Sequence, residues 1–69
     1  MSEFRVSNRV RLARAERGCT QQQLADLIGV TRQTIGLIEA GDYNPTLGLC
    51  LRLARALGKT LNDLFWVEE

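Results

Sequence analysis

The stretch from Thr20 to Ala40 constrains the fold of this 69-residue chain more than any other. Apolar residues recur there at helical spacing in two short segments, Leu24, Leu27 and Ile28 and then Ile35 and Ile38. The spacing predicts two short amphipathic helices that bury these side chains against the rest of the chain.

Local signals place the ends of these two helices. Thr20 followed by Gln23 is typical of a capping box, and Gly29 is a natural helix stop because it adopts a positive φ without strain. Thr31 can then cap the second helix. Because the stop and the restart lie so close together, the helices must cross steeply. The pattern predicts a helix-turn-helix over about residues 20–40, and its second helix, 31–40, can enter the major groove of DNA.

Length and composition indicate one small domain, residues 1–69, with a thin core. An apolar fraction of 45% and a charged fraction of 25% are ordinary for a folded protein. No apolar run approaches the roughly 20 residues of a membrane span, and the first residues resemble neither a signal peptide nor a transit peptide. We therefore expect a cytoplasmic protein with no membrane partner.

The net charge of +1 is small for a protein that binds nucleic acid, because such proteins usually carry a clear excess of basic residues. The distribution helps a little, because the first 40 residues carry six arginines against four acidic residues. A local basic face is therefore allowed, although bulk charge alone does not demonstrate it.

Cys19 and Cys50 are far apart in the sequence, and the chain has no histidine. Two thiols without histidine predict neither a zinc site nor a disulfide framework, so we expect two buried free thiols. The residues also lack a nucleophile–base set and paired carboxylates in an evident cleft, which argues against an enzyme. No cofactor, metal or small-molecule ligand is expected.

Three further helices are predicted around the central stretch. One runs from about Asn8 to Arg17 with Ser7 as its cap. The next is capped by Thr46 and runs to about Leu57, and the last is started by Thr60 and runs from Leu61 to about Leu64. The predicted core-facing residues of the helix after Thr46 are Leu47, Cys50, Leu53, Ala54 and Leu57. Arg52 and Arg55 are predicted to face solvent. Residues 3–6 and 65–68 are rich in β-formers and could pair antiparallel.

Taken together, these motifs resemble the Cro/C1-type (Xre-like) helix-turn-helix regulators. The matching signature spans about residues 8–65 and includes Asn8-Arg9-Val10, Arg17-Gly18, Thr20-Gln21, Leu24-Ala25, the run from Gly29 to Ile35, Ile38-Glu39 and Asn44-Pro45-Thr46. The resemblance implies an all-α, five-helix lambda-repressor-like domain. The β-like ends are similar to those of small dimeric members of the cytolysin-operon repressor type, in which a short sheet accompanies the helices.

Candidate base-reading residues follow from the face of helix 31–40 that lies opposite its inward isoleucines. This arc and its flanks hold Arg32, Gln33, Thr34, Gly36 and Leu37. Gln33 can bond adenine in bidentate fashion, Arg32 can bond guanine, and Leu37 could contact a thymine methyl. Gly36 would let the helix approach the bases closely. The alternative is an ordinary solvated polar face.

Candidate phosphate contacts lie around this helix. Gln21 stands at the first turn of the preceding helix, where backbone N–H groups and a side-chain amide suit a phosphate oxygen, and the resemblance implies the same role. The alternative is that Gln21 only belongs to a cap. Thr31, Tyr43 and Asn44 could add phosphate contacts, although Tyr43 could equally pack against the fourth helix.

Arg14 and Glu39 lie on inward arcs, so each needs a partner, and they resemble the internal ion pair of the family. We expect this pair to fix how the third helix is presented rather than to touch DNA. Losing one partner of such a pair would be costly.

The leading expectation is a transcriptional regulator, preferably a repressor, that binds double-stranded DNA at a palindromic operator as a homodimer. The expected dimer interface is the apolar group of the tail, Leu61, Leu64, Phe65 and Trp66, although Phe65 and Trp66 could instead cover the core of their own protomer. The alternative function is an antitoxin or protein-interaction module that binds DNA only secondarily, and the neighbouring genes would separate the two.

Overall fold

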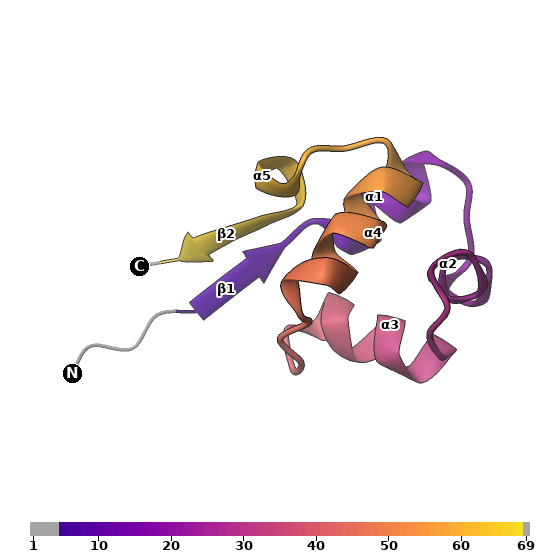
Figure 1. The fold of residues 1–69 in the computed structure, drawn as a ribbon, viewed down its shortest axis with the longest axis horizontal. Helices are drawn as coiled ribbons and strands as arrows, with labels where there is room; N and C mark the ends of the chain where they lie inside the picture. The colour runs from indigo at the N-terminus through magenta and orange to yellow at the C-terminus, as the bar shows by residue number, and fades with distance from the viewer. Residues whose placement is uncertain (1–4, 69) are drawn as a thin grey trace.

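Five helices and a two-stranded ribbon make up the part of the chain that the structure, a computed structural model, describes, residues 5–68 (Figure 1). In chain order the elements are β1 (Arg5–Asn8), α1 (Val10–Glu16), α2 (Gln21–Ile28), α3 (Arg32–Ala40), α4 (Leu47–Leu57), α5 (Leu61–Leu64) and β2 (Phe65–Glu68). This architecture confirms the predicted five-helix fold with a short antiparallel sheet. No helix in the described range is long and apolar enough to cross a membrane.

Four of the helices are capped at their N-termini by threonine side chains, at the positions that the sequence predicts. Thr20 accepts a hydrogen bond from the backbone N–H of Gln23, whose side chain in turn accepts one from the Thr20 N–H. Thr31, Thr46 and Thr60 begin α3, α4 and α5 with the same threonine-to-backbone bond. These caps satisfy N–H groups that have no partner inside the helix, which fixes the first turn of each helix.

The start of α1 differs from the prediction. The helix begins at Val10 rather than near residue 8, and Ser7 lies in β1 instead of capping the helix. Asn8 provides the capping hydrogen bond that was expected from Ser7: its side-chain oxygen accepts a hydrogen bond from the Val10 N–H at 3.1 Å. The reason is that the strand continues as far as Asn8, which pairs with Phe65 across the ribbon.

The ribbon pairs Arg5 with Glu68 at one end and Asn8 with Phe65 at the other. The predicted partner of the tail, 3–6, is thus shifted to 5–8, and residues 3 and 4 lie outside the described range. Figure 1 shows the ribbon projecting from the helices, with the start of β1 and the end of β2 side by side at its far end.

The two faces of the ribbon differ because side chains alternate along a strand. The register places Val6, Phe65 and Val67 on one face and Trp66 on the other. The guanidinium of Arg9 lies 4.8 Å from the centre of the Trp66 ring, a cation–π arrangement on that second face. Trp66 therefore does not share a face with Phe65.

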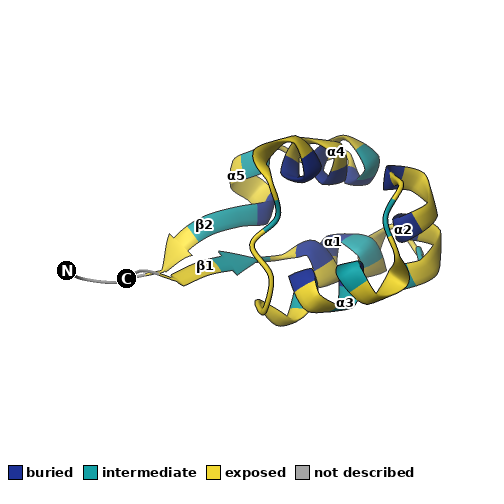
Figure 2. Ribbon diagram, turned by 60° about the horizontal axis from the view of Figure 1, so that its bottom comes forward, coloured by how far each residue is buried: buried dark blue, intermediate teal, exposed yellow. Residues whose placement is uncertain are grey.

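The core lies where the inner faces of α1 to α4 meet, as the dark blue segments of Figure 2 show. Its buried members are Val10, Ala13, Leu24, Ala25, Ile28, Ile35, Ile38, Leu49, Leu53, Ala54, Leu57 and Leu64. Cys50 is also buried, which raises the pKa of its thiol, whereas Cys19 is only half-buried, contrary to expectation.

Two leucines predicted to be in the core are exposed. Leu27 of α2 is 67% exposed and Leu47 of α4 is 65% exposed, while Leu49 takes a core position that the predicted stripe omitted. In both helices the buried face covers a different set of residues from the apolar face that the sequence pattern predicts. The reason is that helical spacing identifies apolar residues on one side of a helix but not which other helices pack there.

Leu64 differs from its predicted place in a dimer interface. The side chain is 1% exposed and fills the core of its own protomer, so it has no surface to offer a partner. Its place at the end of α5, directly before β2, seats the last helix against the others.

Leu64→Ala is expected to lower the free energy of unfolding by about 2–5 kcal/mol, because it leaves a cavity in a thin core. Leu27→Ala removes the same atoms from an exposed site and should change it by about 0.5 kcal/mol or less. Urea denaturation of both variants at one protein concentration measures the difference. Similar losses for the two variants would contradict the assignment of Leu64 to the core.

Candidate nucleic-acid interface

The helix α3 presents one open face and one closed face. Ile35 and Ile38 are at most 1% exposed and bind the helix to the core. Arg32, Gln33 and Leu37 lie on the opposite side and are exposed, together with Ala40. The polar first turn of α3 is therefore exposed to solvent, while the opposite side of the helix is packed in the core.

Thr34 and Gly36 lie half-buried at the edges of this open face. The hydroxyls of Thr31 and Thr34 are 3.0 Å apart, and the Thr31 hydroxyl also caps the helix through the Thr34 N–H. Both threonines are thus engaged with each other at the start of α3, and only their remaining hydrogen-bonding capacity is open to a ligand.

Gln21 lies beside α3 rather than apart from it. Its side-chain Nε2 donates a hydrogen bond to Glu39 Oε1 at 3.0 Å, which crosses from the first residue of α2 to the third turn of α3. A primary amide has two N–H groups, so one remains for a ligand. The cap of α2 is made by Thr20 and Gln23, so Gln21 is not needed for it.

Tyr43 and Asn44 lie in the loop after α3, and both are exposed, Tyr43 to 42%. Asn44 also lines a polar groove with Arg5 and Glu39, between β1 and the end of α3. This loop continues the exposed side of α3 toward the ribbon.

Arg14 and Glu39 form the most buried ion pair in the described range. Arg14 Nε lies 2.7 Å from Glu39 Oε2 and Nη2 lies 3.3 Å from Oε1, with the side chains 16% and 5% exposed. The hydrogen bond to Glu39 raises the pKa of Arg14 further above its ordinary value, so the guanidinium stays charged. Arg14 Nη1 also donates to the carbonyl of Cys19 at 2.9 Å, which fixes the turn before α2.

Two other side chains hold the helix-turn-helix, and the sequence analysis did not identify either role. Asn8 Nδ2 donates to the carbonyl of Ile38 at 2.9 Å, and Arg52 Nη1 donates to the carbonyl of Ile28 at 2.8 Å. Both acceptors lie near helix ends, where carbonyls lack partners inside the helix. No local pattern marks such bonds, because they join residues that are 30 and 24 positions apart.

An apolar groove of about 360 Å³ borders the loop after α3, where Asn44 is among its lining residues, but no residue of α3 lines it. It is lined by side chains from β1, the loop before α4, α4, α5 and β2, among them Val6, Pro45, Leu47, Leu61, Phe65 and Val67. Leu47 and Val67 are 65% and 53% exposed. We call this surface the apolar groove.

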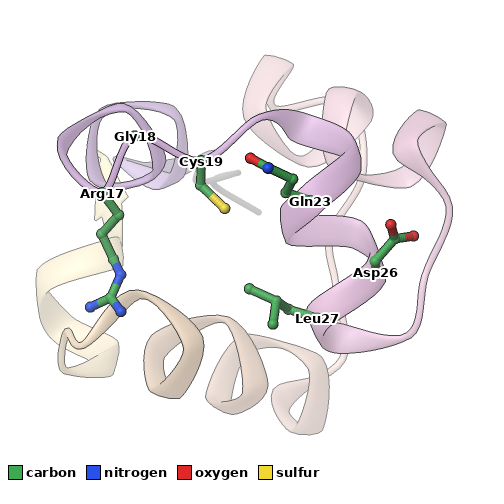
Figure 3. A pocket seen from close by; sticks show the side chains of 6 residues that line it. All are labelled: Arg17, Gly18, Cys19, Gln23, Asp26 and Leu27. Atoms are coloured by element: carbon green, nitrogen blue, oxygen red, sulfur yellow. The ribbon is translucent and has the colours of Figure 1, made fainter.

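A second depression, of about 540 Å³, lies between the α1–α2 turn and the side of α2 (Figure 3). Arg17, Cys19, Gln23, Asp26 and Leu27 line it with Gly18. Figure 3 shows the Asp26 carboxylate turned away from the Cys19 thiol, and no three metal-binding side chains cluster in residues 5–68.

Glu39→Gln is expected to lower the free energy of unfolding by about 3–5 kcal/mol, because Arg14 would keep its charge in a half-buried site without a counter-charge. The measurement is thermal and urea denaturation. Glu16→Gln is the matched control, since the Glu16–Lys59 pair spans 3.6 Å with side chains 56% and 37% exposed and should matter by less than about 1 kcal/mol. Equal melting temperatures for wild type and Glu39→Gln would contradict the prediction.

Known proteins share this arrangement. Residues 10–64 match a protein-family model described as "Helix-turn-helix". An uncharacterized HTH-type transcriptional regulator of Bacillus subtilis, YgzD, is 44% identical over 93% of this chain and 97% of its own. A regulator of the same description from Methanothermobacter thermautotrophicus is 49% identical over 87% of this chain and 88% of its own.

Among solved structures, the restriction-modification controller protein C.AhdI of Aeromonas hydrophila superposes with a TM-score of 0.73. It is 35% identical and is matched over 78% of each chain. The helix-turn-helix geometry and these relatives agree in assigning the protein to one group: the chain belongs to the Cro/C1-type helix-turn-helix family of DNA-binding transcriptional regulators.

Proposed function

We propose that the protein is a sequence-specific transcriptional repressor that inserts α3 into the major groove of a palindromic operator. The observation that carries this proposal is the open face of α3, where Arg32 and Gln33 are exposed at the helix N-terminus. Within residues 5–68 no hydrogen bond or ion pair engages either side chain, so both are free to meet base edges. In this docking mode the first turn of the recognition helix contacts the bases.

Base reading and phosphate binding fall to different residues. Gln33 suits a bidentate contact to adenine and Arg32 one to guanine. The phosphate contacts come from Gln21, Thr31, Tyr43 and Asn44, which flank α3. The N–H of Gln21 that Glu39 does not use is available for a phosphate oxygen, and the bond to Glu39 supports the orientation of the amide.

We further propose that the protein acts as a two-fold dimer joined through the apolar groove. One small domain contacts too few base pairs for useful selection in a genome, whereas a dimer reads two half-sites about 34 Å apart. The groove supports this interface because its exposed Leu47 and Val67 lie outside α3, so a partner on them leaves Arg32 and Gln33 free. Leu61, Phe65 and Trp66 belong to the same surface, and the Trp66 ring also carries the Arg9 guanidinium.

Gln33→Ala is expected to reduce operator affinity by about 1–3 kcal/mol and leave affinity for random duplex almost unchanged, because a base contact carries sequence information. Gln21→Ala should instead weaken all duplexes evenly, because a phosphate contact does not. Fluorescence anisotropy at one fixed salt concentration, with selected and random duplexes, measures both. Equal losses on the two duplexes for both variants would contradict this division.

Leu47→Glu is expected to convert the dimer to a monomer, because it places a charge in the centre of an apolar interface. Leu27→Glu is the matched control, since Leu27 has nearly the same exposure, 67% against 65%, but lies on α2 away from the groove. Sedimentation equilibrium gives the molar mass of each variant at micromolar concentration. A wild-type protein that stays monomeric there and binds a half-site as tightly as a palindrome would rule out the dimer.

A further inference from the structure

Asn8 lies where the ribbon, α1 and α3 meet. It is the last residue of β1 and pairs with Phe65 of β2. Its side-chain oxygen accepts a hydrogen bond from the Val10 N–H at the start of α1, at 3.1 Å. Its side-chain Nδ2 donates to the carbonyl of Ile38, in the last turn of α3, at 2.9 Å. Asn8 therefore connects the ribbon to the C-terminal end of α3.

The carbonyl that Asn8 reaches also takes part in ending α3. The Ile38 carbonyl accepts a second hydrogen bond, from the Gly41 N–H at 3.0 Å. The Asp42 N–H donates to the preceding carbonyl, that of Leu37, at 3.0 Å. A carbonyl oxygen has two lone pairs, so the bonds from Asn8 and Gly41 can form together. The Asn8 amide thus helps to fix the point from which the following loop leaves the helix.

The apolar groove borders both sides of this connection. Val6 and Phe65 line it from the ribbon. Asn44 and Pro45 line it from the loop after α3. A partner that docks there contacts the ribbon and the loop at once. Because two short strands alone are only marginally stable, a partner that holds them together also holds Asn8 against the end of α3.

We propose that Asn8 is a positioning residue that couples docking on the apolar groove to DNA binding. This role rests on the proposed dimer and on the proposed phosphate contacts of Tyr43 and Asn44. When a second copy of the chain docks on the groove, the ribbon closes and Asn8 holds the Ile38 carbonyl. The loop that carries the phosphate contacts is then fixed beside α3. DNA binding favours docking in return, because the coupling between two sites is reciprocal.

The test measures hydrogen exchange at the amides of Gly41 and Asp42, whose backbone bonds end α3 next to the Asn8 contact. Mass spectrometry follows the exchange of the full chain at low and high protein concentration, with sedimentation to give the molar mass. We expect exchange about fivefold slower in the dimer than in the monomer, at the lower end of the usual coupling between two sites. Leu47→Glu should exchange at the faster rate at every concentration.

Two substitutions of Asn8 remove the donor to Ile38 and keep an oxygen that can cap α1. Asn8→Asp has the same shape, and Asn8→Ser adds no charge but ends one bond short of the amide nitrogen. Both variants should still dimerise, while exchange at Gly41 and Asp42 becomes equally fast at every concentration. Their affinity for operator and random duplex should fall about fivefold alike, because phosphate contacts carry no sequence information.

Arg52→Met is the matched control for these variants. It removes a bond to another carbonyl at a helix end, that of Ile28 in α2, but Arg52 belongs to α4 and does not join the ribbon to α3. Exchange at Gly41 and Asp42 should therefore keep its dependence on protein concentration in this variant.

Val67→Gly tests the same connection inside one protomer, because it weakens the ribbon without a partner. In the Leu47→Glu chain it should speed exchange at Gly41 and Asp42, and it should have no further effect once Asn8→Asp is also present. Absence of that effect would overturn the proposal.

Dependence on protein concentration that survives both substitutions of Asn8 would also overturn the proposal, and so would its loss in Arg52→Met. A wild-type chain that stays monomeric at every concentration would instead count against the proposed dimer. The response to Val67→Gly would still decide whether Asn8 connects the ribbon to α3.

Discussion

The carboxylate of Glu39 is the group on which the arrangement of the first three helices depends. It accepts two hydrogen bonds from Arg14 of α1 and one from Gln21 of α2, and it belongs to α3. A carboxylate that is only 5% exposed is costly to bury unless it is paired in this way. Any rotation of α3 about its axis would break these bonds, so the ion pair specifies which side of α3 faces solvent.

The ends of the helix-turn-helix are fastened by the same kind of interaction. Asn8 bonds a carbonyl near the end of α3, and Arg52 bonds one at the end of α2. Together with Glu39 these contacts connect α2 and α3 to α1, β1 and α4. A domain with so thin a core gains little orientation from apolar contact alone, because such contact is not directional. The polar bonds supply this direction and so fix which face of α3 is exposed.

Local signals in the sequence were sufficient for most helix boundaries. Thr20, Thr31, Thr46 and Thr60 begin their helices as predicted, because the bonding partner of a cap lies three residues away. The start of α1 was predicted wrongly, because it depends on where a strand from the far end of the chain stops pairing.

Burial was predicted less well than the helix ends. The apolar patterns of α2 and α4 included Leu27 and Leu47, which lie in solvent, because periodicity identifies an apolar arc but not its neighbours. In the candidate site, the sequence suggested which face of α3 is open and that Arg14 and Glu39 need partners. It did not suggest that Gln21 bonds Glu39 or that Asn8 and Arg52 bond helix carbonyls, since those contacts exist only in the folded chain.

The ribbon has a consequence for local unfolding. Its pairing of Asn8 with Phe65 closes a loop through all five helices, and two short strands alone are marginally stable in water. The ribbon can therefore open while α1 to α4 stay folded, so its amide hydrogens should exchange with solvent faster than those of the core helices. Because Val6 and Val67 belong to both the ribbon and the apolar groove, slower exchange at β1 and β2 would be a direct signal that a partner has docked there.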